Sequence, residues 1–468
     1  MKKKLLLLAI TLFLILSYGT AQESEKKEAL QPEIKLIFWN RASAIDYIFP
    51  LAEIVSTNMF VKDFAIYVMG QDWKETSFDT LKANLTTPWI WDTSSFQKNQ
   101  GAHAYFGSLY FTASRSNGLS FAQSLLYTGT GSFLWETVQE AGTNSLNDFL
   151  TTTFAGAVLG EQLFRLGNEA FAVHPLLGFI IDPFGTFNYF IRGRQPEQGQ
   201  SKIYSIELSA GPAFLFSSVN YVDNDEGLFE NQQEKNLQGF FDMKIVYQDP
   251  YNHNSKELMD QFETELFLAK DTGGYKLKAD FDSTLFSRGL GDAVNKDKTL
   301  GLSYNYNVTY SSRMWLSTNS TGLFFKQRNN LNAGELVWGL EGDYIFLGVT
   351  DSIQKVSKGK LCPKAYTFTN GPELKFYLGF NSPTAGTFSL KGKGAFLFSY
   401  GQAGKMLIPE GDYFVAEASA SYSHKIFAGL SAGLKADFTG KYQLNPSSDR
   451  ELNENEFSAS IFASYIFN

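Results

Sequence analysis

From residue 202 to the C-terminus, apolar and polar residues alternate with a period of two. Such alternation is typical of β-strands that have one apolar and one polar face. The last segment is the clearest, because Phe457, Ile461 and Phe467 lie on one face and Ser458 and Ser460 on the other. Twelve segments follow the pattern: 202–218, 237–249, 260–270, 275–287, 299–311, 320–328, 334–348, 366–380, 386–400, 411–425, 427–442 and 456–467.

These segments have lengths near the ~9–11 residues that a tilted transmembrane strand needs. The sequence therefore predicts a mainly β fold, an outer-membrane antiparallel β-barrel of about 12 strands (about 10 to 14) over residues 202–468. Short and long connections alternate along most of this region, as expected for periplasmic turns and external loops. The alternation fails at Asp271–Gly274, which is short where a long loop is due.

The first 21 residues have the features of a cleaved secretory signal peptide. Lys2–Lys4 form its charged region and Leu5–Leu16 its apolar region, with small residues at Gly19 and Ala21. Residues 22–201 are predicted to form an N-terminal helical domain before the barrel. Within it, 34–69 is predicted to be a helix or interfacial segment, 72–85 a short helix and 87–107 a structured loop.

Two further segments predict a helical hairpin, from Leu119 to Glu140 and from Ser145 onward, because the loop between them is short. Ser145 with Asp148 three residues later is a variant of the capping box. We expect Gly156 and Gly160, on the second helix, to pack against the small polar stripe 124–132 of the first. The segment 174–191 contains two prolines and two glycines, which excludes one continuous helix.

Composition narrows the choice of function. The chain has 48 acidic and 40 basic residues, which argues against nucleic acid as a partner. It has one cysteine and four widely spaced histidines, so no disulfide, metal or cofactor is expected. Aromatic residues make up 16% of the chain while its mean hydropathy is only −0.18, as expected where lipid-facing residues alternate with polar ones. No run of ~18 uninterrupted apolar residues follows the signal peptide.

The segment 84–167 carries a long motif: Asn84-Leu85, Trp91-Asp92, Phe96, Asn99, His103, Gly107–Phe111, Arg115–Gly118, Gly131-Ser132, Trp135-Glu136, Glu140, Ser145, Asn147-Asp148 and Gly160-Glu161. In these residues it resembles bacterial domain-of-unknown-function family 3943, an uncharacterised family of exported proteins. Ala104 and Asn144 depart from the family pattern, where proline is expected. The resemblance implies that the segment 84–167 carries the protein's function, but it does not imply any particular reaction.

Four residues are candidates for a catalytic or cation-binding role: Glu136, Glu140, Asp148 and His103. Clustered carboxylates bind cations or act as acid and base, and histidine is a common general base. In the structural alternative, Asp148 caps its helix, Glu140 faces water and Glu136 accepts a hydrogen bond. The backbone amides that start the second helix are the nearest predicted donors to Glu136.

Ligand binding has its own candidates, Arg115, Trp135, Asn147 and Glu161. Arg115 and Glu161 would bind an anionic group or, alternatively, form a structural ion pair. No nucleophile elbow, Cys-x-x-Cys pair, zinc-protease motif or phosphate loop is present in the sequence.

Three interpretations follow. The first is a non-enzymatic outer-membrane barrel with helices that plug or abut it, with a structural role or a role in binding or passage of a small or lipidic ligand. Its partners would be outer-membrane lipid and the barrel-insertion machinery. The second is an outer-membrane enzyme that acts on lipid or envelope polymer through the hairpin carboxylates. The third is a soluble periplasmic binding protein.

Overall fold

The computed structural model describes residues 40–467 except 41, 71–75, 93, 195–199, 224–227, 272–273, 291–295, 313, 352–355, 358–359, 362–365, 403–410 and 445–449. The predicted signal peptide lies outside the described residues. The following account concerns the part of the chain from Leu36 onward, which is one compact unit.

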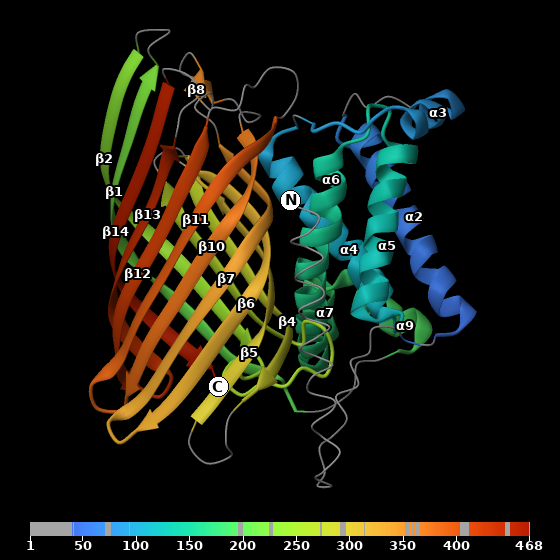
Figure 1. The fold of residues 1–468 in the computed structure, drawn as a ribbon. Helices are drawn as coiled ribbons and strands as arrows, with labels where there is room; N and C mark the ends of the chain where they lie inside the picture. Colours follow the sequence, from blue (N-terminus) through green and yellow to red (C-terminus); the bar gives the residue numbers. More distant parts are fainter. Residues whose placement is uncertain are drawn as a thin grey trace, which may run out of the picture. The chain divides into compact units, whose positions relative to one another are not determined.

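Twelve antiparallel strands form a closed barrel, which confirms the predicted fold class (Figure 1). The strands are β1 (Ile203–Asp223), β2 (Leu228–Tyr247), β3 (Gln261–Asp271), β4 (Gly274–Gly289), β5 (Lys296–Tyr310), β6 (Trp315–Leu331), β7 (Gly334–Asp351), β10 (Tyr366–Ser382), β11 (Gly386–Gln402), β12 (Asp412–Phe427), β13 (Leu430–Leu444) and β14 (Arg450–Phe467). Each strand pairs with its neighbour in sequence, and β1 pairs with β14 to close the ring. The short β8 (Val356–Ser357) and β9 (Lys360–Leu361) pair with each other outside the barrel.

Side chains alternate between the lumen and the outer surface, as the period of two requires. On β4, Lys276 and Lys278 line the lumen, whereas Tyr275 and Leu277 are exposed on the outer face. The apolar half of each strand therefore forms the outer wall of the barrel, and the ionisable half lines its interior.

Eleven helical segments precede the barrel among the described residues. They are α2 (Ala44–Tyr67), α3 (Phe78–Thr86), α4 (His103–Ser116), α5 (Phe121–Leu134), α6 (Leu146–Leu150), α7 (Gly156–Val173), α8 (Pro175–Ile181) and α9 (Pro183–Arg192), together with the first of three π-helical turns, η2 (Gln97–Ala102). The other two turns, η3 (Trp135–Gln139) and η4 (Thr151–Ala155), extend α5 and join α6 to α7. As predicted, Ser145 caps α6 by accepting a hydrogen bond from the backbone of Asp148, 3.2 Å away.

The expected partner of the two glycines in α7 is wrong. A Cβ atom on Gly156 would lie 2.6 Å from Cα of Gly107, and one on Gly160 would lie 2.7 Å from Cβ of Phe111. Both contacts are to α4 and not to α5. The segment 87–107, interpreted as a loop, contains the start of α4, and this helix occupies the place that the sequence assigned to α5.

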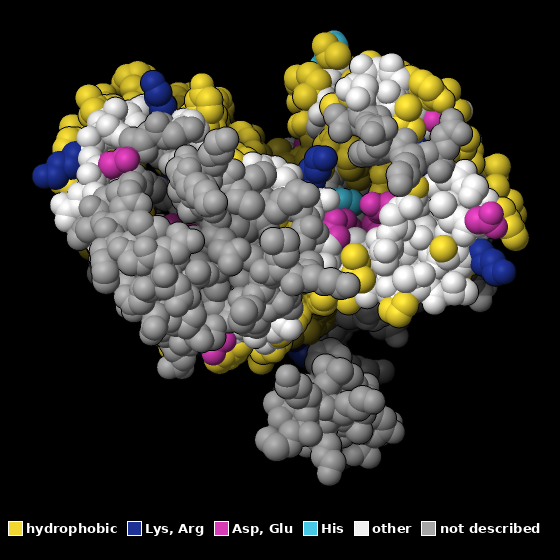
Figure 2. All heavy atoms as spheres, turned by 90° about the horizontal axis from the view of Figure 1, so that it is seen from above, with side chains coloured by type: hydrophobic (Ala, Val, Ile, Leu, Met, Phe, Trp, Pro, Cys, Tyr) yellow, Lys and Arg dark blue, Asp and Glu magenta, His cyan; other side chains and the backbone are white. Residues whose placement is uncertain are grey.

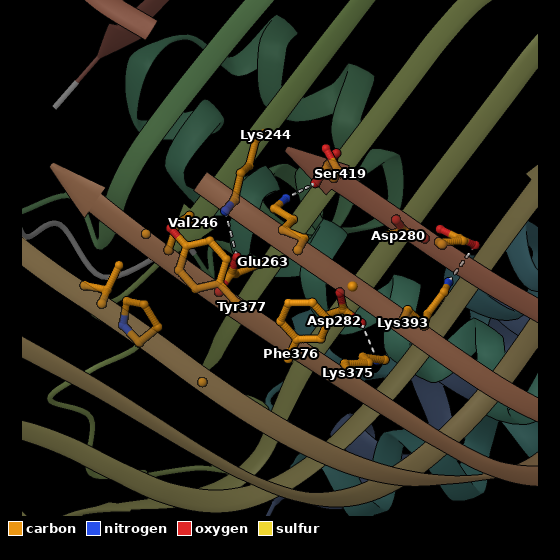
Figure 3. Close-up of a pocket in the computed structure, with 18 of the residues that line it drawn as sticks. Lys244, Val246, Glu263, Asp280, Asp282, Lys375, Phe376, Tyr377, Lys393 and Ser419 are labelled. Carbon is orange, nitrogen blue, oxygen red and sulfur yellow. Dashed lines mark hydrogen bonds and ion pairs between the residues drawn. The ribbon is translucent and has the colours of Figure 1, made fainter. Parts of the chain in front are cut away.

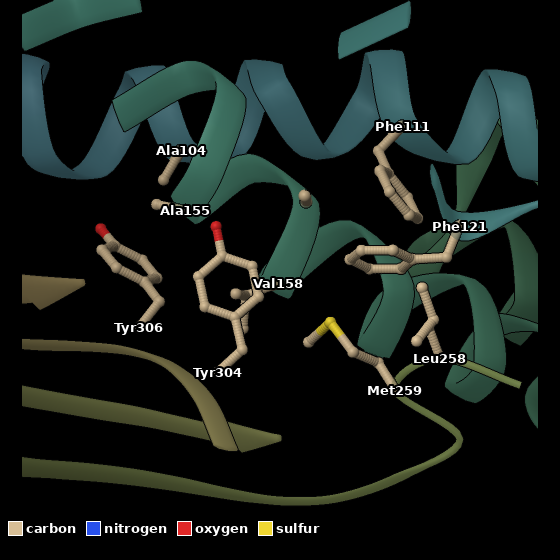
Figure 4. Packing of buried hydrophobic residues seen from close by; sticks show 10 residues of the cluster. Ala104, Phe111, Phe121, Ala155, Val158, Leu258, Met259, Tyr304 and Tyr306 are labelled. Atoms are coloured by element: carbon tan, nitrogen blue, oxygen red, sulfur yellow. The ribbon is translucent and has the colours of Figure 1, made fainter. Parts of the chain in front are cut away.

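The helices lie against the outer face of the barrel wall, the second of the two placements that the sequence left open (Figure 1). Tyr304 and Tyr306 of β5 pack with Phe111 and Val158 of the helices in one buried cluster (Figure 4). A second buried cluster joins Phe96, which precedes η2, to aromatic and aliphatic residues of β6, β7 and β10. The helices therefore bury part of the apolar outer wall.

Candidate functional site

The three carboxyl groups and the histidine predicted as a site lie together at one end of the helical domain. Glu136 is in η3, Glu140 follows η3, Asp148 is in α6 and His103 begins α4. The Nε2 atom of His103 lies 3.4 Å from Oδ2 of Asp148, and its Nδ1 atom lies 3.1 Å from Oγ1 of Thr152. We call Glu136, Glu140, Asp148 and His103 the acid cluster.

Glu136 is completely buried. Its Oε2 atom accepts a hydrogen bond of 2.7 Å from the backbone N–H of Ser145, which confirms the predicted role of the amides at the start of the second helix. Its Oε1 atom accepts no hydrogen bond from any residue that the structure describes. The carboxyl group of Glu140 interacts with that of Glu136. Two adjacent carboxyl groups favour a state in which at least one holds its proton.

Burial controls the protonation of the cluster. Burial, and next the negative charge of Asp148, raise the pKa of Glu140 to about 7. Burial also raises the pKa of Glu136 and of Asp148 well above the usual range for carboxyl groups. The pKa of His103 is lowered, again chiefly by burial. Glu140 therefore exchanges its proton near neutral pH, as a general acid or base must.

Amide side chains hold the loop of the hairpin in place. Nδ2 of Asn84 donates to the backbone carbonyl of Glu140 at 2.8 Å and, less closely, to those of Glu136 and Thr137. Nδ2 of Asn144 donates in turn to the carbonyl of Asn84 at 3.0 Å. The loop that carries Glu140 is therefore fixed by α3.

Asp92 is a fourth acidic residue beside the cluster, and it is not among the predicted candidates. Its Oδ1 atom accepts hydrogen bonds from Nδ2 of Asn147 at 3.1 Å and Nδ2 of Asn99 at 2.5 Å. Nδ2 of Asn147 also donates to Oδ1 of Asp148 at 2.8 Å. Asn147, predicted to bind a ligand, thus links two carboxyl groups. The only sequence signal for Asp92 is its place in the family motif.

Arg115 and Glu161 lie at the opposite end of α4, about 18 Å from His103 at 1.5 Å of rise per residue. The guanidinium of Arg115 contacts both oxygens of Glu161, at 2.7 and 3.0 Å, and Arg165 contacts Glu161 at 2.7 Å. Both arginines also reach Glu257, between β2 and β3. These contacts match the structural alternative, an ion-pair network that ties the helices to the barrel. The remaining candidate, Trp135, lies half-buried in η3, directly before Glu136.

Seen from the end that carries the acid cluster, the molecule is hollowed where the helices meet the barrel (Figure 2). Acidic and histidine side chains are visible in this hollow. Trp91 stands beside Asp92, and its ring lies 4.5 Å from that of Phe368 on β10 and 5.5 Å from that of Tyr400 on β11. The cluster is therefore bordered by apolar aromatic surface from the barrel.

The barrel lumen contains a cavity of about 550 Å³ lined by lysine, glutamate and aspartate side chains. Figure 3 shows two of its ion pairs, Lys244 with Glu263 and Lys375 with Asp282. Lys278 on β4 lies 2.6 Å from Glu417 on β12, and these strands are six places apart in the ring of twelve. Ion pairs therefore cross the lumen from one wall to the opposite wall.

Side chains fill the lumen nearer the end of the barrel that adjoins the acid cluster. Lys441 is completely buried, 2.6 Å from Oδ1 of Asp351 and 2.8 Å from Oε2 of Glu454. A cluster of apolar side chains that includes Ile345 and Tyr413 is also buried within the barrel. Among the described residues, these side chains therefore occupy the interior of the barrel at this end.

Comparison with known proteins gives a family for the helical domain. Residues 88–183 match the family described as Domain of unknown function (DUF3943). The match confirms the resemblance found in the sequence, and the acid cluster lies within the matched segment. No curated protein matches the chain.

Solved structures similar to the chain are outer-membrane barrels. The COG4313 outer membrane channel from Pseudomonas putida F1 has a TM-score of 0.32 and 11% identity, covering 58% of this chain and 97% of that one. A Pseudomonas aeruginosa FadL homologue has a TM-score of 0.23 and 9% identity, with coverages of 56% and 90%. The outer membrane protease OmpT from Escherichia coli has a TM-score of 0.23 and 9% identity, with coverages of 58% and 99%.

Proposed function

We propose that this protein resides in the bacterial outer membrane and that its DUF3943 domain binds a small or lipidic ligand with a positively charged amine. One observation carries the proposal. Glu136, Glu140 and Asp148 gather beside His103, and within the described part of the chain none of these carboxyl groups forms an ion pair with lysine or arginine. Buried carboxyl groups are costly when charged and alone, so an incoming cation is the favourable partner.

The surroundings of the cluster support a ligand with an apolar part. Trp91 directly precedes Asp92 and is half-buried, and its ring contacts that of Tyr400, which is 42% exposed, and that of Phe368, which is fully buried. Aromatic faces attract organic cations, and their apolar area accommodates an acyl chain. An amine-bearing lipid headgroup matches both parts of the hollow, with its amine at the acids and its chains along the barrel wall.

Passage through the lumen is less well supported. The Lys278–Glu417 pair crosses the barrel, and Lys441 with its two carboxylates occupies the interior beyond it. A solute would have to break these contacts to cross. The cavity of about 550 Å³ is large enough to hold a small molecule.

The proposal is tested by thermal unfolding of the purified protein in detergent with phosphatidylethanolamine, which carries an amine, or phosphatidylglycerol, which does not. We expect phosphatidylethanolamine to raise the melting temperature of the natural protein and of Glu169→Gln, a control outside the cluster. Glu140→Gln and Asp148→Asn should lose most of that rise. Equal stabilisation by the two lipids, or an unchanged rise in both cluster variants, would refute the proposal.

A second candidate function is enzymatic, and the titration of Glu140 near neutral pH favours it. A half-buried carboxyl group with a pKa of about 7 beside a neutral histidine is suited to general acid–base catalysis. If the cluster is catalytic, Glu140→Gln should fold normally, should still bind the lipid, and should reproduce the envelope-lipid changes of a deletion strain. A strain carrying Glu140→Gln with the lipid profile of the natural strain rules this function out.

A further inference from the structure

Helix α2 has its polarity reversed relative to a helix of a water-soluble bundle. Its buried side includes Asp46, Glu53, Asn58 and Lys62. Its exposed side carries Ile45, Ile48, Leu51, Val55, Met59, Phe60 and Phe64, with exposed fractions from 38% to 67%. A soluble helix buries its apolar stripe and presents charge to water. Here the charged side chains point into the bundle instead.

The buried charges are well satisfied. Asp46 contacts Arg192 at 2.7 Å and Arg194 at 2.6 Å, and Nζ of Lys62 donates to the backbone carbonyl of Gln139 at 2.9 Å. Oε2 of Glu53 accepts a hydrogen bond of 3.1 Å from Asn117. Oε1 of Glu53 accepts no hydrogen bond from the described residues. Asp46, Lys62 and Oε2 of Glu53 all have partners inside the bundle, so the reversed polarity is a built feature of it.

The neighbouring helices repeat the pattern. On α5, Ser124, Thr128 and Ser132 are buried while Leu126 and Phe133 are exposed. Along α8 and α9 the exposed large side chains are apolar: Leu176, Leu177, Phe179, Ile180, Phe187, Phe190 and Ile191. The buried side chains are mainly polar, namely Asp182, Thr186 and Asn188, together with the aromatic Tyr189. The bundle has a polar interior and an apolar exterior, as proteins surrounded by lipid do.

The dimensions also match a bilayer. Among the described residues α2 is the one helix that is long and apolar enough to cross a membrane by length and composition, with a window hydropathy of 1.2. Its 24 residues span about 36 Å, against ~30 Å for the hydrocarbon core. In Figure 1 the bundle stands beside the barrel over much of the barrel's height, and Figure 2 shows hydrophobic side chains along the outer edges of both.

We infer that the helical bundle is embedded in the same bilayer as the barrel, with the outer face of α2 and α5 in contact with lipid acyl chains. The apolar outer wall of the barrel and the apolar face of the bundle then form one continuous belt. The single exposed charge along the described part of α2 is Asp63, in its last turn, where the belt would end. An acyl chain in the bilayer beside this belt would have lateral access to the end of the bundle that carries the acid cluster.

The inference is tested by fluorescence quenching of single-cysteine variants in a Cys362→Ser background. Val55→Cys reports on the middle of the exposed face of α2. Leu237→Cys, on the outer face of β2, is the control for lipid exposure, and Asp79→Cys, on α3, is the control for water. Each full-length variant carries an environment-sensitive dye and is reconstituted into phosphatidylcholine vesicles, with or without bromine near the ends of the acyl chains. Aqueous iodide is the second quencher.

We expect brominated lipid to quench the dye at Val55 severalfold more than the dye at Asp79, and to an extent comparable with Leu237. Iodide should quench Asp79 strongly and Val55 weakly. Iodide quenching at Val55 equal to that at Asp79 would show that this face meets water. Failure of both quenchers at Val55 would show that protein covers it, such as a second copy of the chain. Either result overturns the inference and leaves the proposed ligand binding to be judged by its own assay.

Discussion

The contact between α4 and α7 is so close that a single methyl group should separate the two helices. Gly156→Ala would place a Cβ atom 2.6 Å from Cα and 2.7 Å from the carbonyl carbon of Gly107. Carbon atoms in ordinary contact are ~3.5–4.0 Å apart, so the helices must move apart by about 1 Å. Both neighbours are backbone atoms, and no side chain can turn away to make room.

The expected cost follows from two opposing effects. Overpacking of a tight core costs ~1–3 kcal/mol, whereas alanine is favoured over glycine inside a helix by ~0.5–1 kcal/mol. We therefore expect Gly156→Ala to lower the free energy of unfolding by about 1–2 kcal/mol. The matched control is Gly129→Ala on α5, whose Cβ would lie 3.5 Å from Thr153, an ordinary contact. The control should be neutral or slightly more stable than the natural protein.

The assay is thermal unfolding in detergent, followed by far-ultraviolet circular dichroism for the helices and by heat-modifiable gel migration for the barrel. We expect the helical signal of Gly156→Ala to be lost at a lower temperature than that of Gly129→Ala. The temperature of the barrel transition should be the same in both variants. Equal melting of the two variants would refute the packing argument, because it would mean that α4 and α7 tolerate a side chain between them.

Three more predictions concern charged groups. Burial raises the pKa of Glu140 from its ordinary value of 4.5 to about 7, so the folded protein binds this proton more tightly than the unfolded chain does. The associated stability is full below pH 4.5 and declines as the pH rises through 7. Glu140→Gln should flatten the dependence of the melting temperature on pH over this range, and an unchanged pH profile would contradict the assignment. Arg115→Ala should cost ~3–5 kcal/mol in urea unfolding of the helices, because it leaves the buried Glu161 with a single arginine partner; a cost below ~1 kcal/mol would show that the pair is dispensable. Lys441→Met should cost a similar ~3–5 kcal/mol, because it removes a completely buried ammonium group that contacts both Asp351 and Glu454. The gel migration of the barrel should change at a lower heating temperature, and no such shift would contradict this.

The strands could be predicted because their exposure pattern is simple. Each strand has one face toward the lumen and one toward the outside, so its residues alternate, and all twelve predicted segments are strands. Helix α4 has no such pattern, because it is enclosed on nearly all sides by α5, α7, α9 and the barrel-facing segments. Gly101 of η2 and Gly107 of α4 are unfavourable inside a helix, yet Gly107 is small because α7 passes directly over it.

Helix α2 shows a different limit of prediction from sequence. A search for an uninterrupted apolar run overlooks it, because Asp46, Glu53 and Lys62 interrupt the run. The structure shows that all three point into the bundle, where their partners come from distant parts of the chain. Nothing local in the sequence distinguishes a charge that faces water from one that faces such partners.

The acid cluster was predictable because a short loop brings Glu136 and Asp148 together, and the hairpin geometry needs only local sequence. The ion pairs of the lumen were not. Lys278 meets Glu417 only after the barrel has closed with a particular register, and no single segment contains that information.

The closing seam of the barrel also sets an order of events in folding. The strand β1 pairs with β14 along nearly its full length, from Ile206 opposite Phe467 to Asp223 opposite Arg450. Almost the whole barrel sequence separates these partners, and contacts between such distant segments form slowly and late. Until β14 has been exported, β1 and β13 each present an unpaired edge that can join another chain. A chain that ends before β14 therefore cannot close its own barrel. The preceding eleven strands form a closed ring only when the final residues pair with β1.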